Sequence, residues 1–81
     1  MKNNWRERIA IDPKIMFGKP VIRGTRVPVE LILEKRANGE SIEHLLNAYP
    51  RITKDDIFAC LFYAQYSVKN DIAYPTASVA S

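Results

Sequence analysis

Three positive charges are concentrated in the twelve-residue stretch GKPVIRGTRVPV, which runs from Gly18 to Val29. Arginine offers a planar guanidinium that matches a phosphate group, and glycines let the backbone approach an anion closely. The candidate nucleic-acid-binding residues are therefore Lys19, Arg23, Thr25 and Arg26. The alternative is structural, because an arginine here can pin the turn to a carboxylate or to helix carbonyls. Both roles can hold for different residues.

The other reactive residue types form no catalytic pattern. His44 stands on a polar helix face without a paired acid near it, and we expect a surface histidine. Cys60 belongs to an apolar stripe and is expected to be a small buried residue. One cysteine and one histidine cannot complete a tetrahedral zinc site, and the chain has no phosphate loop. We therefore expect no enzymatic activity, cofactor, metal or small-molecule substrate.

The stretch around Lys19 and Arg23 is predicted to lie in a β-ribbon. Residues 8–11 form a short apolar strand, and residues 21–23 form a second β-branched run that can pair with it antiparallel. Gly18 and Pro20 mark a turn between the two runs. Because an isolated two-stranded ribbon is marginal in water, these strands must pack on helices or on another chain.

Three helices are predicted after the ribbon, over residues 28–38, 42–48 and 54–69. Gly39 ends the first helix and Ser41 caps the second. Thr53 and Asp56 have the spacing of a capping box for the third. The tight connection of residues 49–53 is typical of a helix-turn-helix. The predicted fold is mainly α with a short N-terminal β-ribbon, as a three-helix, helix-turn-helix or winged-helix-like bundle.

The length and composition predict one small domain. With 81 residues, the chain is assigned a single domain at residues 1–69 and a flexible C-terminal tail at residues 70–81. The core of so small a domain is marginal, and the single cysteine excludes an internal disulfide, so oligomerisation is the remaining source of stability. No apolar run approaches the roughly 20 residues that span a bilayer, and we expect a cytoplasmic protein without membrane contact.

The third predicted helix carries two apolar stripes. The expected core stripe comprises Ile57, Cys60, Leu61, Ala64 and Val68. The second, aromatic stripe comprises Phe58, Phe62, Tyr63 and Tyr66. Contiguous exposed aromatic residues usually mark a protein interface, so we expect a homodimer or a hetero-partner here. The alternative is that the β-ribbon or the first helix covers them, and Trp5 is either a packing lid or an interface anchor.

The charge is unevenly distributed along the chain. Residues 1–36 hold nine Lys and Arg against four Asp and Glu, whereas residues 37–81 hold three against five. A basic half favours a nucleic-acid partner, with an ordinary solvated surface as the alternative. The third helix begins with Asp55 and Asp56, whose carboxylates would repel phosphates. The ribbon is therefore the better candidate to contact nucleic acid, since strands can also enter a groove.

Residues 9–64 resemble the bacterial domain-of-unknown-function family four-three-three. The resemblance rests mainly on the stretch from Gly18 to Val29, which fits the pattern GKPxIxGTR-[IV]-PV. An aspartate-proline precedes it, and a YPxLTxEDI-like segment follows, in which Ile52 replaces the usual leucine. The resemblance implies a small helical, winged-helix-like domain. It also implies an antitoxin of a type II toxin–antitoxin pair, with a PIN-like ribonuclease toxin as its partner.

Three functions stay open on this sequence. The first is an antitoxin that binds its toxin and also operator DNA. The second is a stand-alone DNA-binding transcriptional regulator, and the third is a purely structural dimerisation module. The neighbouring reading frame would discriminate among them most cheaply.

Overall fold

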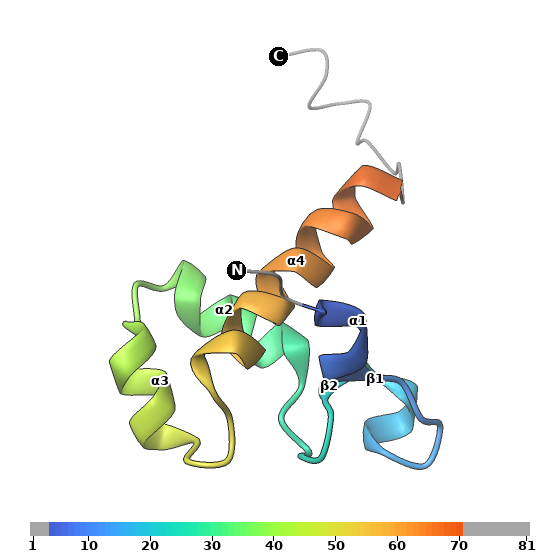
Figure 1. Ribbon diagram of the computed structural model, residues 1–81, viewed down its shortest axis with the longest axis horizontal. Helices are drawn as coiled ribbons and strands as arrows, with labels where there is room; N and C mark the ends of the chain where they lie inside the picture. Colours follow the sequence, from blue (N-terminus) through green and yellow to red (C-terminus); the bar gives the residue numbers. More distant parts are fainter. Residues whose placement is uncertain (1–3, 71–81) are drawn as a thin grey trace.

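The computed structural model describes residues 4–70. Its elements are α1 (Trp5–Arg8), β1 (Ile9–Ala10), the 3₁₀ helix η1 (Met16–Gly18), β2 (Val21–Ile22), α2 (Val29–Ala37), α3 (Ile42–Ala48) and α4 (Lys54–Asn70). Figure 1 shows α4 as the long element at the centre, with α1 beside it and the other helices around its N-terminal half. The C-terminal half of α4 projects beyond the rest of the fold (Figure 1).

The predicted architecture, mainly helical with a short N-terminal ribbon, is confirmed. β1 and β2 pair antiparallel, with Ile9 opposite Ile22 and Ala10 opposite Val21. Each strand is only two residues long, shorter than predicted. The sequence did not predict α1 or η1, because a single turn is too short for hydrophobic periodicity to reveal.

The predicted ends of the three longer helices are confirmed to within one residue. Pro28 stands one position ahead of α2, and Gly39 follows that helix with a φ of +91°. The Ser41 hydroxyl accepts a hydrogen bond from the His44 N–H at 3.0 Å, which caps α3 as expected. Asn70 ends α4, and residues 71–81 of the predicted tail lie outside the described residues.

The core lies where α2, α3 and the ribbon meet α4. Its buried members are Ile9, Ile22, Val29, Ile32, Leu45, Ile52, Ile57, Ala59 and Cys60. The predicted core stripe is correct for Ile57 and Cys60 but wrong for Leu61 and Val68, which are 42% and 67% exposed. The physical reason is that the C-terminal half of α4 extends beyond the rest of the fold (Figure 1), so the other elements of residues 4–70 cover Leu61 only partly and Val68 still less.

Within residues 4–70, no helix combines the length and the apolar character needed to cross a membrane.

Candidate protein and nucleic-acid interfaces

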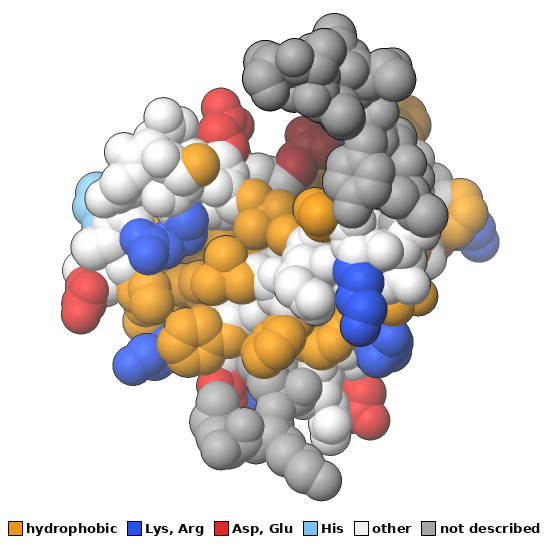
Figure 2. All heavy atoms as spheres, turned by 90° about the horizontal axis from the view of Figure 1, so that it is seen from above, with side chains coloured by type: hydrophobic (Ala, Val, Ile, Leu, Met, Phe, Trp, Pro, Cys, Tyr) orange, Lys and Arg blue, Asp and Glu red, His pale blue; other side chains and the backbone are white. Residues whose placement is uncertain are grey.

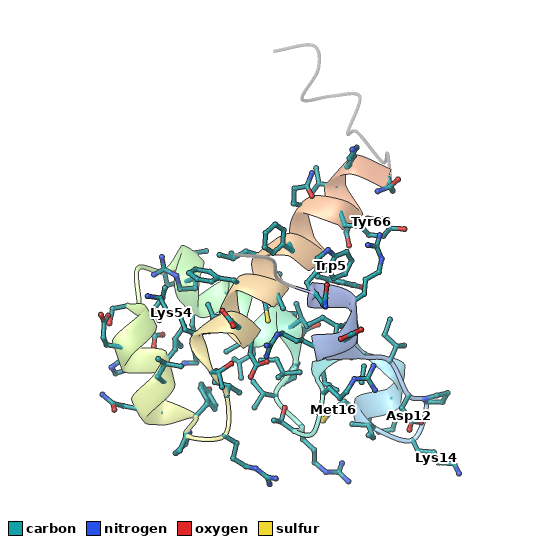
Figure 3. All side chains as sticks on the ribbon, viewed as in Figure 1. Trp5, Asp12, Lys14, Met16, Lys54 and Tyr66 are labelled. Atoms are coloured by element: carbon teal, nitrogen blue, oxygen red, sulfur yellow. The ribbon has the colours of Figure 1, made fainter. Side chains whose placement is uncertain are left out.

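α1 covers one flank of α4 with aromatic contacts. The Trp5 ring lies edge-on to Tyr63, with ring centroids 6.1 Å apart, and is 5.4 Å from the Tyr66 ring (Figure 3). The Arg6 guanidinium stacks over both Trp5 and Tyr66, at 4.5 and 4.9 Å from the ring centroids. Trp5 is thus a packing lid, and it covers part of two of the four aromatic residues predicted to form an interface.

A second side of α4 is partly exposed to solvent. Phe62 is 46% exposed there, and Phe58 is half-buried with the Lys54 ammonium 6.0 Å from its ring centroid. Together with Leu61 and Val68, these residues form an apolar surface that we call the Phe62 face. Figure 2 looks down on the end from which α4 projects and shows hydrophobic side chains gathered across it. Of the four aromatic residues predicted to form an interface, Phe62 and Tyr66 are thus the more exposed, and Tyr66 keeps 41% exposure beside Trp5.

The acidic start of α4 has a structural use. Asp56 accepts a hydrogen bond from the Thr53 N–H at 2.9 Å, and Thr53 Oγ1 accepts one from the Asp56 N–H at 3.2 Å, which confirms the capping box. The other carboxylate oxygen of Asp56 accepts from Arg8 Nη1 at 3.1 Å. Arg8 also lies 3.6 Å from Asp55. Asp56 therefore joins the cap of α4 to the end of α1.

Three of the four predicted nucleic-acid-binding residues have contacts within the fold. Lys19 pairs with Glu30 at 3.3 Å, on the surface. Thr25 Oγ1 donates to the Ile22 carbonyl at 2.6 Å and accepts from the Val27 N–H at 3.0 Å, which closes the loop between β2 and α2. Arg23, the third, is held by the backbone.

Arg23 joins the ribbon to the end of α1. Its Nε donates to the Glu7 carbonyl at 2.6 Å, and its Nη2 donates to the Ile9 carbonyl at 3.2 Å. This contact matches the structural alternative, in which an arginine pins the turn to carbonyls.

Arg23→Ala is expected to lower the free energy of unfolding by about 1 kcal/mol, because two carbonyls lose a charged donor at a partly solvated site. Thermal unfolding measures this loss. The affinity of the variant for nucleic acid should change less than that of Arg26→Ala. The reverse order would show that Arg23 contacts the ligand itself.

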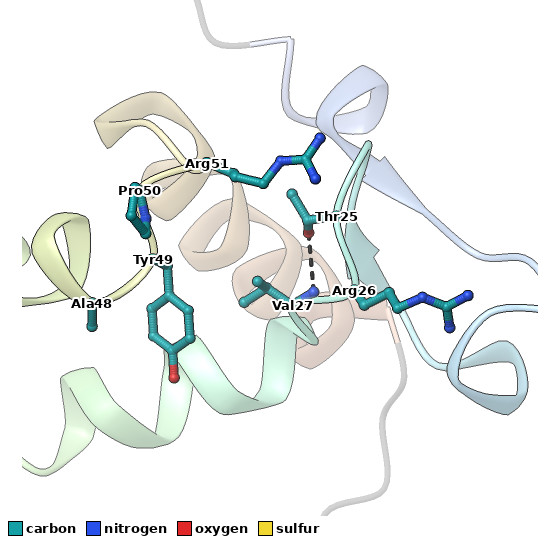
Figure 4. A pocket seen from close by; sticks show the side chains of 7 residues that line it. All are labelled: Thr25, Arg26, Val27, Ala48, Tyr49, Pro50 and Arg51. Atoms are coloured by element: carbon teal, nitrogen blue, oxygen red, sulfur yellow. Dashed lines mark hydrogen bonds between the residues drawn. The ribbon is translucent and has the colours of Figure 1, made fainter.

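Arg26 forms no hydrogen bond or ion pair with any residue that the structure describes. It borders an open groove of about 390 Å³, whose lining is Thr25, Arg26, Val27, Ala48, Tyr49, Pro50 and Arg51 (Figure 4). Arg51, from the turn between α3 and α4, is likewise unpaired within residues 4–70. The sequence did not identify Arg51 as a candidate site residue. Arg51 lines the same groove as Arg26 only because the fold brings residues 23–27 and 49–53 together.

The single cysteine lies in the core, as predicted. Cys60 is fully buried, and this burial, with a smaller contribution from the charge of Asp56, raises the pKa of its thiol to about 12. His44 is exposed, as predicted, but the expectation that no acid pairs with it is wrong. Its Nε2 lies 3.3 Å from the carboxylate of Glu40, one helical turn before it. In residues 4–70, no three His, Cys, Asp or Glu side chains are grouped so that they could hold a metal ion.

Cys60 is expected to resist thiol reagents at pH 8 in the folded protein and to react at once after unfolding in guanidinium. Because the folded-state pKa is raised, the unfolded chain loses the thiol proton first. Stability should therefore fall as the pH rises above about 8.5 toward 12. Rapid labelling of the native protein by Ellman's reagent would contradict the buried position.

Comparison with known proteins identifies relatives without an assigned activity. The family model described as "Protein of unknown function (DUF433)" matches residues 9–64. The uncharacterized protein y4eO of Sinorhizobium fredii is 40% identical over 60 residues, which are 74% of this chain and 27% of that protein. The chain thus spans about a quarter of the length of that relative. An uncharacterized protein of Archaeoglobus fulgidus is 62% identical over 24 residues, 30% of this chain and 67% of that protein.

One solved structure has a similar fold. The crystal structure of a DUF433 member from Anabaena variabilis superimposes with a TM-score of 0.69 at 31% sequence identity. The superposition covers 83% of this chain and 69% of the Anabaena chain. The family match over residues 9–64 and this common fold show that the chain belongs to the DUF433 family of proteins of unknown function.

Proposed function

We propose that this chain is the antitoxin of a type II toxin–antitoxin pair, which binds a PIN-like ribonuclease toxin and has no catalytic activity of its own. The observation that carries the proposal is the Phe62 face of α4, an apolar surface that stays partly exposed within residues 4–70. The sequence resemblance to a family regarded as antitoxins gives this partner its chemical class. Such a toxin acts on RNA in the cytoplasm, so the proposal places the chain there.

The spacing of the Phe62 face suits insertion of a helix into a groove. Leu61 and Phe62 follow Phe58 by three and four residues, and Val68 follows Leu61 by seven. These intervals place apolar side chains along one side of a helix, as in other amphipathic helices that dock in hydrophobic grooves. The projection of α4 beyond the body leaves room for a partner to surround this side (Figure 1).

The proposal is tested by co-expression with the product of the adjacent reading frame. We expect a stable complex on gel filtration and loss of the partner's ribonuclease activity upon complex formation. A neighbour without ribonuclease activity, or two purified proteins that do not associate, would contradict the proposal. The expected homodimer is the competing use of the same face. A dimer through Phe62 with no affinity for the neighbour would identify a structural dimerisation module instead.

A second candidate function is binding of operator DNA, alone or in addition to the toxin. Arg26 favours it, since its guanidinium has no partner within residues 4–70 and lies in the basic half of the chain. The measurement is an electrophoretic mobility shift with the duplex upstream of the chain's own gene. Specific binding with a steep salt dependence, weakened in Arg26→Ala, would support the regulator. Binding that is equal for unrelated duplexes would not.

A further inference from the structure

Among residues 4–70, Phe17 is the most exposed large hydrophobic residue, at 98%. It also has a left-handed backbone, with φ of +58°, and Met16 before it has φ of +50°. Left-handed conformations are unfavourable for residues with a Cβ, and two in succession are rare. The fold gains no buried area from the phenyl ring in return. Such a conformation is a reason to look for a ligand.

The loop that carries Phe17 is held in one shape by its own hydrogen bonds. The Lys14 N–H donates to the Asp12 carboxylate at 2.9 Å, and the Ile15 N–H donates to the Asp12 carbonyl at 2.8 Å. Further along, the Gly18 N–H donates to the Ile15 carbonyl at 3.1 Å. The exposed ring is therefore presented by an ordered loop, which reduces the entropy lost when a ligand stacks on it.

Several cations lie at the same end of the molecule as the loop that carries Phe17. The loop of residues 11–20, the loop of residues 23–27 and the turn of residues 49–53 all reach the end of the molecule opposite the projecting end of α4 (Figure 1). Arg26 points toward the segment that contains η1 (Figure 4), and Lys14 points outward from the same loop as Phe17 (Figure 3). Residues 11–30 hold four Lys and Arg against two carboxylates, and Arg51 adds another cation.

We propose that this edge binds single-stranded nucleic acid, with one base stacked on Phe17 and the flanking phosphates on Arg26, Arg51 and Lys14. An exposed aromatic ring beside cations is the combination with which proteins hold unpaired bases and their backbone. The ring needs a base with a free face, which a single strand offers and a stacked duplex does not. An acidic peptide fits less well, because the face of an aromatic ring carries partial negative charge and repels a carboxylate.

This inference goes beyond the proposed function. Neither toxin binding at the Phe62 face nor recognition of a duplex operator requires an unstacked base. Phe17 lies in η1, whereas Phe62 lies in α4. The C-terminal half of α4 projects away from η1 (Figure 1), so a variant at either residue should leave the other surface intact. Loss of single-strand binding and loss of toxin binding can therefore be measured independently of each other.

The test uses the full chain with three fluorescein-labelled probes: dT12, U12 and a hairpin duplex of 12 base pairs. We expect measurable binding to dT12 or U12 at low salt, with a log–log salt slope of about −2 for three phosphate contacts. The two single-stranded probes distinguish DNA from RNA. Phe17→Ala should weaken binding by about 10- to 100-fold without changing the slope. Arg26→Ala and Arg51→Ala should each reduce the slope by about 0.7.

Phe62→Ala is the matched control, since it removes a partly exposed ring from a different element, α4. Phe17→Trp should bind with wild-type affinity or better, because indole stacks on bases at least as well as a phenyl ring. Since Phe17 is exposed, the melting temperature of Phe17→Ala should equal that of the wild type. No binding of dT12 or U12 at 50 mM salt would overturn the proposal, as would unchanged affinity of Phe17→Ala. Equal binding of a twelve-residue poly-glutamate peptide would also overturn it.

Discussion

Phe62→Glu is expected to weaken binding of the partner protein by at least about 100-fold, while the melting temperature of the free chain stays unchanged. Truncation of a central aromatic residue in an interface commonly costs 2 kcal/mol or more, which corresponds to about 30-fold in affinity. The introduced carboxylate adds a desolvation cost when the partner covers it. Because Phe62 is half-exposed in the free chain, the folded state itself should lose little.

A charge-matched control separates loss of the Phe62 contact from a general effect of charge. Asn47→Glu changes the net charge by the same amount at an exposed site on α3. Its affinity should stay within about threefold of the wild type, since rim and remote charges contribute little. Isothermal titration of both variants with the product of the adjacent gene measures the difference. If Phe62→Glu bound the partner with wild-type affinity, the Phe62 face would not be the binding surface.

Asp56→Ala is expected to lower the free energy of unfolding by roughly 2–4 kcal/mol. The substitution removes the capping box of α4 and leaves the Arg8 guanidinium without its closest carboxylate. The estimate stays below that of a fully buried pair, because the Arg8 side chain is 38% exposed. In a domain of this size, the loss corresponds to a melting temperature lower by about 10–25 °C.

Asp55→Ala provides the comparison for Asp56→Ala. Asp55 lies at 3.6 Å from Arg8 with a partly exposed side chain, so its contribution should be about 1 kcal/mol or less. Thermal and urea unfolding of both variants measure the two losses. Equal losses would mean that the charge of the first turn matters and that the capping box does not.

Local sequence signals predicted most of the fold. Ser41, Thr53 and Asp56 placed the starts of α3 and α4 correctly, because a capping side chain bonds to backbone only two or three residues away. Gly39 placed the end of α2 for a similar reason. The pairing of the ribbon followed from two β-branched runs separated by a turn. Each of these features depends on neighbours in the chain.

The features that sequence reasoning missed depend on distant contacts. α1 is a single turn that Trp5 and Arg8 hold against α4, at residues about 50 positions away. Which side of α4 is exposed depends on how far the other helices extend along it, and the sequence does not give that distance. For this reason the assignment of Leu61 to the core is wrong. Arg23 and Arg26 are equally good candidates for phosphate binding in the sequence. Only the fold shows that Arg23 donates to backbone carbonyls, whereas Arg26 has no partner within residues 4–70.

Hydrogen–deuterium exchange of the chain, with and without the purified product of the adjacent reading frame, would show whether the Phe62 face of α4 binds the partner. We expect the partner to slow exchange of the backbone amides of residues 58–70, the part of α4 that carries the Phe62 face, and to leave exchange in residues 11–27 unchanged. Protection confined to residues 11–27 and 49–53, with no change in α4, would contradict it.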